Sequence, residues 1–349
     1  MEEQGLIIKE MPVPQITDNE VLVQMLFASV CGSDYPYITH LKDRSHLYGN
    51  IIGHEGAGII VQKGKNVQSL EFDDYVGFES HRATDYWLER GKDPYKDPNA
   101  AVIGYKPFDN GVLPHGTFSE YIAVPAMYAI KLSKDLINTY PGSLFEPWGN
   151  AVRIFETARP FITRDSKIVV SGAGFQGVQI MLILKYYYGH SNIYAIDISP
   201  ARLRFIKENI TGNAFLPNEL PNGQYDIWLE VSGSGKAIEQ ALNFTKEGGQ
   251  VILFGIPTKE IALFGNDVHD IIFGSKEMQI NGINVKGVFG RFREDWDLTN
   301  EMIPKIAKSF QMSKIFTYWG SLDNLPCLLK NQYFSNPKPD FFKAVFSKF

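Results

Sequence analysis

Cysteine is scarce in this 349-residue chain, which has only Cys31 and Cys327. Two cysteines cannot form the disulfide framework of a small secreted domain. Long apolar runs are absent too, so the sequence predicts no membrane-spanning helix. The first residues, M-E-E-Q-G, are acidic and lack the basic and apolar regions of a signal peptide. Together these absences predict a cytoplasmic protein.

Basic residues show no excess. The chain carries 34 Lys and Arg against 39 Asp and Glu, a net charge of -5. Without a Lys/Arg-rich stripe there is no electrostatic footprint for nucleic acid. Hydrophobic residues make up 44% and charged residues 21%, as in an average globular protein. The length exceeds one ordinary core, which favours two domains.

The first 140 residues or so are typical of β structure. Runs such as V-L-V-Q-M-L-F (21–27) and G-I-I-V-Q (58–62) lie between Gly, Asn and Asp turns. A stretch rich in Pro, Gly and charge follows at 79–116 and indicates a long surface excursion, which is often functional. T-F-S-E-Y-I-A-V (117–124) is expected to resume a strand.

The pattern changes near residue 145, where short apolar strands begin to alternate with helical segments. Strands are expected at 167–171, 192–197, 226–231 and 250–255, with a helix around 235–246. A further helix is predicted to begin with Ser199 as N-cap and Pro200 at its first position. Such alternation predicts a parallel sheet covered on both faces.

A glycine-rich fingerprint lies at the first turn of this second part. Gly172-Ala-Gly-Phe-Gln-Gly177 fits G-x-G-x-x-G between a strand and a helix, and Asp197 follows 20 residues later. Gly172 would allow the tight turn, Gly174 the approach of a pyrophosphate, and Gly177 close packing of helix and strand. A carboxylate at 197 would bind ribose hydroxyls and repel a 2′-phosphate, so NAD is favoured over NADP. The alternative is a purely structural turn. The candidate cofactor-binding residues are Gly172, Gly174, Phe175, Gln176, Gly177, Asp197 and Arg202.

A second constellation lies upstream. It consists of Cys31 in S-V-C-G-S-D, the pair His54-Glu55 in G-H-E-G-A-G, and Glu146 at the hinge into the second part. Thiolate, imidazole and carboxylate together form a ligand set suited to Zn²⁺. Taken alone, His54 is more simply explained as a hydrogen-bonded core histidine. Glycines at 53, 56 and 58 would let the backbone approach a metal and cofactor pocket.

These motifs in this order resemble the zinc-dependent medium-chain dehydrogenase/reductase superfamily over nearly the whole chain. E-P-W-G-N-A-V (146–152) and V-K-G-V-F-G-R (285–291) are most similar to its threonine and polyol (sorbitol-type) dehydrogenase branch. The resemblance implies an α/β protein with a GroES-like β-rich catalytic domain at 1–145 and 291–349. It also implies a Rossmann doubly wound parallel-sheet domain at 146–290 that binds NAD.

The resemblance also implies the chemistry. Cys31, His54 and Glu146 would contact one catalytic zinc, and Glu55 would be a direct ligand or one that exchanges with water or substrate. Zinc would lower the pKa of a substrate hydroxyl so that hydride can pass to NAD, with Ser33 relaying the proton. The substrate would be a secondary alcohol: a polyol, a sugar or a hydroxy amino acid such as threonine. Family members pair through the edge of the nucleotide-domain sheet, here around 279–290, so a homodimer or homotetramer is expected.

Two positions depart from the family pattern. Pro36 stands where a relay histidine is usual, and His40 or His46 are alternative relays. The excursion at 79–116 has none of the four cysteines that usually bind a structural zinc, so one zinc per chain is expected. In their place we expect apolar anchors and ion pairs. The anchors would be Tyr86, Trp87, Tyr95 and Tyr105, and the ion pairs would come from Arg82, Asp85, Arg90 and Lys92.

The substrate pocket is poorly specified by the sequence. The candidates for pocket or cofactor contacts are Tyr35, Tyr37, His115, Phe118, Trp148 and Arg291. Two other functions compete with the zinc dehydrogenase. One is a zinc-free quinone or enone reductase of the same fold, disfavoured by the complete ligand set. The other is a non-catalytic nucleotide-binding relative, which Pro36 and the cysteine-free excursion make conceivable.

Overall fold

The computed structural model describes residues 5–38, 43–108, 110–136, 142–255, 282–329 and 342–347, with only the backbone at 35, 36 and 135. The chain forms two compact units. The first unit comprises Met1–Pro147, Phe292–Asn300 and Gln311–Phe349, and the second comprises Trp148–Arg291 and Glu301–Phe310. A search of the described helices finds none with the length and apolar character needed to cross a bilayer.

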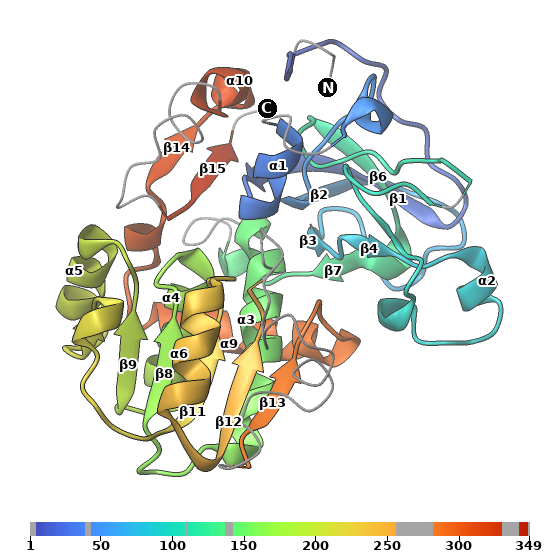
Figure 1. Ribbon diagram of the computed structural model, residues 1–349. Helices are drawn as coiled ribbons and strands as arrows, with labels where there is room; N and C mark the ends of the chain where they lie inside the picture. Colours follow the sequence, from blue (N-terminus) through green and yellow to red (C-terminus); the bar gives the residue numbers. More distant parts are fainter. Residues whose placement is uncertain are drawn as a thin grey trace. The chain divides into compact units, whose positions relative to one another are not determined.

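The first unit is built on a seven-stranded sheet in the order β14-β15-β1-β2-β3-β7, with β6 also paired to β1 (Figure 1). Its strands are β1 (Glu20–Ser29), β2 (Glu55–Lys63), β3 (Tyr75–Phe78), β6 (Tyr121–Pro125), β7 (Ala129–Lys131), β14 (Tyr318–Gly320) and β15 (Ala344–Ser347). All pairs are antiparallel except β14 with β15. The register of β1 with β2 sets Ser29 opposite Glu55.

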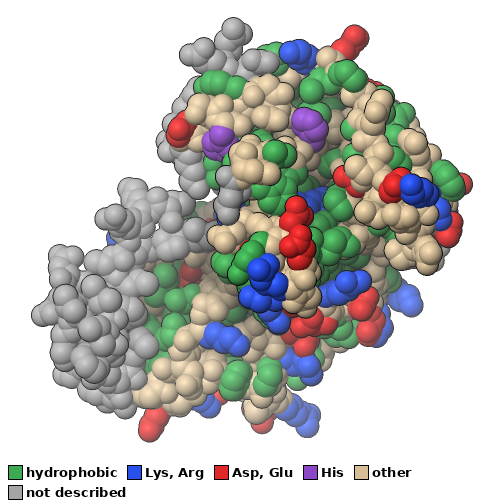
Figure 2. All heavy atoms as spheres, turned by 90° about the vertical axis from the view of Figure 1, so that its right-hand side faces the viewer, with side chains coloured by type: hydrophobic (Ala, Val, Ile, Leu, Met, Phe, Trp, Pro, Cys, Tyr) green, Lys and Arg blue, Asp and Glu red, His purple; other side chains and the backbone are tan. Residues whose placement is uncertain are grey.

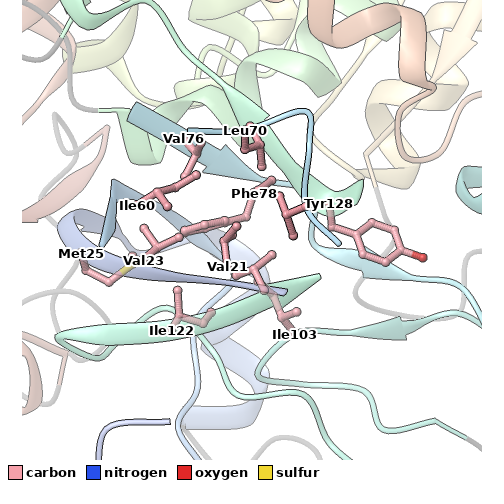
Figure 3. Close-up of a cluster of buried hydrophobic side chains, with 13 residues drawn as sticks. Val21, Val23, Met25, Ile60, Leu70, Val76, Phe78, Ile103, Ile122 and Tyr128 are labelled. Atoms are coloured by element: carbon pink, nitrogen blue, oxygen red, sulfur yellow. The ribbon is translucent and has the colours of Figure 1, made fainter. Parts of the chain in front are cut away.

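A cluster of buried β-branched, aromatic and other apolar side chains packs together between the strands of the first unit and forms its core (Figure 3). The labelled side chains that point into it come from four strands: Val21, Val23, Met25, Ile60, Val76, Phe78 and Ile122. Val21, Val23 and Met25 alternate along β1, which is the period-2 pattern that the sequence shows. Each buried side chain of this size contributes about 1.5–3 kcal/mol through the hydrophobic effect. The predicted β-rich first part is confirmed.

One predicted strand begins later than expected. The run 117–124 is a strand only from Tyr121, because the preceding amides bind another partner. Gly116 N–H donates to the Ile51 carbonyl at 2.9 Å, and Phe118 N–H donates to the Ile52 carbonyl at 3.0 Å. These bonds attach the end of the excursion to the turn that carries His54.

The excursion at 79–116, here called the lobe, contains the two-residue strands β4 (His81–Arg82) and β5 (Ala101–Val102) and helix α2 (Asp85–Leu88). Asp97 ties it together: its carboxylate accepts from Thr84 N and Thr84 Oγ1, both at 2.7 Å, and from Asn99 N at 2.8 Å. Burial would raise the pKa of Asp97, but the bonds from Thr84 and Asn99 outweigh it and hold this pKa below its ordinary value.

Cations in the lobe lie over aromatic rings. The Arg82 guanidinium is 4.5 Å from the Tyr128 ring centre, and burial lowers its pKa to about 10. Lys92 lies 4.4 Å from Trp87, and Arg90 lies 3.6 Å from Tyr86. The ion pairs expected for these cations stay a prediction. A ring face attracts a cation without needing a carboxylate.

The second unit is a six-stranded parallel sheet in the order β10-β9-β8-β11-β12-β13. Its strands are β8 (Ile168–Ser171), β9 (Ile193–Ile196), β10 (Ala214–Phe215), β11 (Tyr225–Glu230), β12 (Thr245–Leu253) and β13 (Asn284–Gly287). Helix α4 (Phe175–Leu182) follows β8, α5 (Pro200–Asn209) follows β9, and α6 (Gly235–Phe244) packs on β11 and β12 (Figure 1). The predicted parallel sheet is confirmed.

Local signals in this unit behave as the sequence indicates, with one exception. Ser199 caps α5, its Oγ accepting from Arg202 N at 3.3 Å, and Pro200 is the first helical residue. Helix α4 gives way to a π-helix at Ile183–Tyr187. The other α-helices among the described residues are α1 (Tyr35–Ile38), α3 (Phe145–Ala158), α9 (Arg293–Ala307) and α10 (Leu325–Leu328).

Candidate metal centre and dinucleotide site

Three potential metal ligands converge in the first unit. Cys31 follows β1, His54 immediately precedes β2, and Glu55 is the first residue of β2. Because β1 and β2 pair with Ser29 opposite Glu55, the end of one strand meets the start of the other. One ligand atom from each of Cys31, His54 and Glu55 lies within 4.8 Å of the others. Strand register therefore explains how residues 23 positions apart come together.

His54 lies between an acid and the thiol. Its Nδ1 is 3.3 Å from Asp34 Oδ1, and Asp34 Oδ2 accepts from Cys31 N at 2.9 Å. Burial would lower the pKa of His54, but the Asp34 carboxylate and the Cys31 sulfur raise it well above its ordinary value. With Nδ1 turned to Asp34, Nε2 is the ring atom that remains for a metal.

Glu55 is completely buried and held on both oxygens. Lys343, the residue before β15, has its Nζ 2.7 Å from Oε1 and 2.7 Å from Oε2. Ser29 Oγ also donates to Oε2. Burial raises the pKa of Glu55, with the nearby Glu146 acting in the same direction and Lys343 and His54 opposing it. Lys343, 288 residues away in the chain, was not anticipated from the sequence.

Glu146 lies in the first turn of α3 and is 5% exposed. Its Oε1 accepts from Ser80 Oγ at 3.1 Å. The structure brings its charge close enough to raise the pKa of Glu55, although Glu146 is not within the 4.8 Å group. Ser33, the expected relay hydroxyl, is exposed in the turn after Cys31.

The glycines of the His54 turn serve packing. At Gly53, with φ of +95°, a Cβ would lie 2.7 Å from the Phe118 ring. At Gly58 it would lie 2.1 Å from the Gln24 carbonyl oxygen of β1. Close contact with Phe118 and with β1 therefore requires glycine at these two positions, and the expected approach of the backbone to a pocket stays a prediction.

The chemistry of the donor set fits a divalent cation. A thiol, an imidazole and a carboxyl group are gathered within 4.8 Å, with Asp34 beside the histidine and Lys343 beside Glu55. Buried anionic groups are stable only when paired or when they coordinate a metal. His54 Nδ1 and Asp34 Oδ1 have no other hydrogen-bond partner among the described residues. The mixture of sulfur, nitrogen and oxygen donors is the set that zinc accepts.

The glycine-rich turn of the second unit forms the start of α4. Gly172 has φ of +101°, and a Cβ there would lie 3.0 Å from Ser232 N. A Cβ at Gly177 would lie 1.9 Å from the Gly172 carbonyl oxygen. At Gly174 a Cβ would meet only Arg202 Nη1, at 3.8 Å, so the space over this residue is open. Gly174 is also the N-cap of α4 and provides no side-chain cap, which fits an anion at the helix N-terminus.

Asp197 does more in the structure than a ribose ligand requires. Its Oδ2 accepts from Ala173 N at 2.7 Å, and its Oδ1 accepts from Ser199 N at 2.8 Å. Arg202 Nη1 lies 3.7 Å from Oδ2. The carboxylate therefore links the glycine-rich turn to the N-terminus of α5. Phe175 and Gln176 are half-buried in the first turn of α4.

Glu230 is a residue of this site that sequence reasoning missed. It ends β11, is buried, and accepts hydrogen bonds from Ser232 N at 2.8 Å and Gly233 N at 3.2 Å. Burial raises the pKa of Glu230. Because Ser232 backs directly onto Gly172, Glu230 fixes the loop beside the glycine-rich turn.

The remaining candidates lie in several settings. Arg291 is buried and donates from Nη1 to Asn150 Oδ1 at 2.8 Å, and Trp148 is also buried, both in the second unit. In the first unit, His115 is exposed, and Tyr37 and Phe118 are half-buried. The side chains of Tyr35 and Pro36, and all of His40, lie outside the described residues. On the face drawn in Figure 2, acidic and basic side chains are interspersed without a broad basic patch among the described residues.

Two family models match the chain. Residues 17–134 match the alcohol dehydrogenase GroES-like domain, and residues 176–303 match the zinc-binding dehydrogenase model. These matches fall on the β-rich first unit and the parallel sheet of the second.

Individual proteins are similar over almost the full length. L-threonine 3-dehydrogenase of Alteromonas mediterranea is 27% identical over 342 residues, covering 92% of this chain and 91% of that protein. The structure of galactitol-1-phosphate dehydrogenase from Escherichia coli has a TM-score of 0.82 at 20% identity, covering 97% and 96% of the two chains. An Escherichia coli short chain alcohol dehydrogenase solved with NADH has a TM-score of 0.81 at 20% identity, covering 99% and 97%. The two solved structures share the fold described above.

Proposed function

The chain belongs to the zinc-dependent medium-chain dehydrogenase/reductase superfamily, in its threonine and polyol dehydrogenase branch, and we propose that it oxidises a secondary alcohol with NAD through a single catalytic zinc. The first unit is the proposed catalytic domain and the second the proposed NAD-binding domain.

One observation carries this proposal: the grouping of the Cys31, His54 and Glu55 donor atoms within 4.8 Å in the first unit. A zinc-free reductase of the same fold has no use for a half-buried thiol held together with a buried imidazole and a buried carboxylate. Desolvating these groups without a cation would cost several kcal/mol for each charge. A ligand set kept at that cost supports metal-dependent chemistry over mere nucleotide binding.

Each residue of the centre has a proposed role. Cys31, His54 and Glu146 hold the metal. Glu55, which Lys343 and Ser29 restrain, is the fourth group and either binds the metal directly or exchanges with water or substrate. Asp34 fixes the His54 ring through Nδ1. When bound, zinc supplies a Lewis acid that makes an alcohol easier to deprotonate. The exposed hydroxyl of Ser33 then takes the proton toward solvent.

The proposed cofactor site rests on the second unit. The open space at Gly174 and the uncapped start of α4 would receive the pyrophosphate of NAD. Asp197, which follows β9, would accept hydrogen bonds from ribose hydroxyls, and a carboxylate at this position disfavours a 2′-phosphate. Arg202 would lie beside the same ribose, since its guanidinium borders both Gly174 and Asp197.

The proposed substrate is a polyol, a sugar or a β-hydroxy amino acid such as threonine. Carboxylates at 55 and 146 make the centre more polar than a cysteine-rich one, which suits a hydroxyl-rich substrate. The similarity to L-threonine 3-dehydrogenases supports the same classes.

NAD reduction in the presence of such substrates tests the function. The wild-type chain should reduce NAD with at least one alcohol of these classes. Cys31→Ala should abolish turnover while NADH binding, followed by fluorescence, stays within about twofold, because Cys31 lies in the first unit and Asp197 in the second. Turnover that survives this substitution would exclude the metal mechanism.

We further propose that the protein works in the cytoplasm as a homodimer or homotetramer. Strand β13 supports the proposed oligomer, because it is an edge strand of the second unit's sheet among the described strands and is largely exposed. Residues 279–281 of the expected pairing segment lie outside the described residues. Light scattering at several concentrations would measure the oligomeric state.

A further inference from the structure

A tyrosine from the lobe reaches the metal centre. Tyr105 is 5% exposed, and its ring packs edge-on against the His54 ring with centroids 5.4 Å apart. The Tyr37 ring centre also lies 5.1 Å from that of Tyr105. Tyr105 therefore contacts a proposed ligand from a segment more than 40 residues downstream of it.

The backbone around Tyr105 is fixed from both sides. Gly104 has φ of +74°, and a Cβ there would lie 2.6 Å from the Gly53 carbonyl oxygen, so only glycine permits this approach to the His54 turn. The Tyr105 carbonyl accepts from His46 Nε2 at 2.9 Å. His46 thus acts as a backbone anchor through Nε2. His46 is therefore linked to the metal centre indirectly, through its hydrogen bond to the Tyr105 backbone.

The hydroxyl of Tyr105 lies near an acid, because burial and the Asp34 carboxylate together raise the pKa of Tyr105 well above its ordinary value. The Tyr105 hydroxyl and Asp34 Oδ1 are both buried, and neither has a hydrogen-bond partner among the described residues. Asp34 Oδ1 also lies 3.3 Å from His54 Nδ1. A donor and an acceptor, both enclosed and both lacking alternatives, have only each other to satisfy them.

Asp34 connects this contact to two proposed ligands. Its Oδ2 holds the Cys31 amide at 2.9 Å and its Oδ1 faces His54 Nδ1. A carboxylate that orients a metal-bound histidine strongly affects metal affinity. Whatever fixes that carboxylate therefore fixes the ligands through it.

We propose that Tyr105 is a positioning residue for the metal centre, which orients Asp34 and through it His54 and Cys31, so that the cysteine-free lobe acts as a support for the catalytic ligands. The inference rests on the proposed function, because it presupposes that these residues bind zinc.

The direct test is the rate at which zinc leaves the intact protein in excess chelator, which needs no substrate. Tyr105→Phe keeps the ring between His54 and Tyr37 and removes only the hydroxyl. We expect dissociation about tenfold faster, at the lower end of the 10–100-fold range for outer-shell partners. The absorption bands of the cobalt-substituted protein should shift as well, since they report ligand geometry.

Tyr128→Phe is the matched control. Its hydroxyl is also buried in the first unit and accepts from Ala83 N at 2.8 Å, but it is bound to the lobe and not to Asp34. This variant should lose stability while its zinc dissociation stays within about twofold of wild type. Equal acceleration in both variants would mean that general loosening of the lobe explains the effect, and the proposal would be overturned.

A double-variant cycle tests the route through Asp34. In an Asp34→Ala background, Tyr105→Phe should add less than about twofold to the rate of zinc dissociation, because the acceptor that the hydroxyl orients has been removed. If the two substitutions instead multiply their separate effects on the rate of zinc dissociation, the proposal would be overturned. A wild-type protein that binds no zinc would refute the proposed function itself. A wild type that binds zinc, with Tyr105→Phe identical to it in dissociation and cobalt spectrum, would refute only the inference.

Discussion

Lys343→Met is the perturbation whose consequences the structure defines most sharply. Lys343 and Glu55 are 4% and 0% exposed, and the lysine nitrogen lies 2.7 Å from each carboxylate oxygen. The substitution leaves Glu55 buried opposite a thioether of similar length. Removing one partner of a buried ion pair costs about 3–5 kcal/mol, because the other charge is left uncompensated. We expect this loss in the free energy of unfolding of the metal-free protein.

Two comparisons isolate the pair. Lys131→Met makes the same change at a pair in the same unit, Lys131 with Asp74 at 2.7 Å, where the lysine is 60% exposed. It should cost less than about 1 kcal/mol. Adding Glu55→Gln to Lys343→Met should recover part of the loss, because the uncompensated charge is removed.

Urea unfolding of chelator-treated protein measures these differences. Hydrogen exchange of peptides from β2 would assign the transition to the first unit, since a two-unit chain need not unfold in one step. Loading with zinc should reduce the difference in free energy of unfolding between Lys343→Met and wild type, because a bound cation compensates the charge of Glu55. A loss no larger than that of Lys131→Met would refute the reasoning.

Other predictions concern the lobe and the dinucleotide site. Asp97→Asn should lower stability by about 2 kcal/mol near pH 7, because it weakens charge-assisted bonds. The pKa of Asp97 lies below its ordinary value, so its contribution is present above the unfolded pKa of about 3.9 and disappears as the pH falls through the folded value. Urea midpoints from pH 7 to pH 3 should therefore converge for variant and wild type; a constant gap would contradict this. Gly177→Ala should destabilise the fold in thermal melts, whereas Gly174→Ala should leave stability nearly unchanged and weaken NADH binding at least tenfold; equal melting losses would contradict the assigned roles. Asp197→Ala should weaken NADH and relax discrimination against NADPH in fluorescence titrations, and an unchanged preference would remove Asp197 from that role.

Much of the fold is local in origin, and those parts could be predicted. The strand β8, the glycine-rich turn and the Ser199 cap follow from residues within one turn of each other, so their signals survive in the sequence. Motif spacing alone could not show that Cys31 lies beside His54 and Glu55. Neither segment by itself encodes the antiparallel pairing of β1 with β2 that brings them together.

The missed residues share a different property. Lys343 reaches Glu55 from the residue before β15, and no local pattern marks a lysine 288 residues away as the partner of Glu55. Tyr105 looked like one of several apolar anchors, because only the approach of Gly104 to Gly53 sets its ring beside His54. Asp34 was the exception that could have been found, since it lies three residues from Cys31 in a quoted motif.

The lobe shows how tertiary context decides between alternatives. Arg82, Arg90 and Lys92 have charges that fit ion pairs, and aromatic residues nearby fit a small apolar core. The structure combines the two in cation–ring contacts, and Asp97 supplies the bonds that tie the segment together. Four cysteines and a zinc are not required when one buried carboxylate satisfies three donors.

The central claim is that Cys31, His54 and Glu146 hold one catalytic zinc, and elemental analysis of protein purified without chelator tests it most directly. The account predicts one zinc per chain, lost in Cys31→Ala and retained in Cys327→Ala, whose thiol is exposed. Absence of zinc after reconstitution, or zinc that persists in Cys31→Ala, would contradict it.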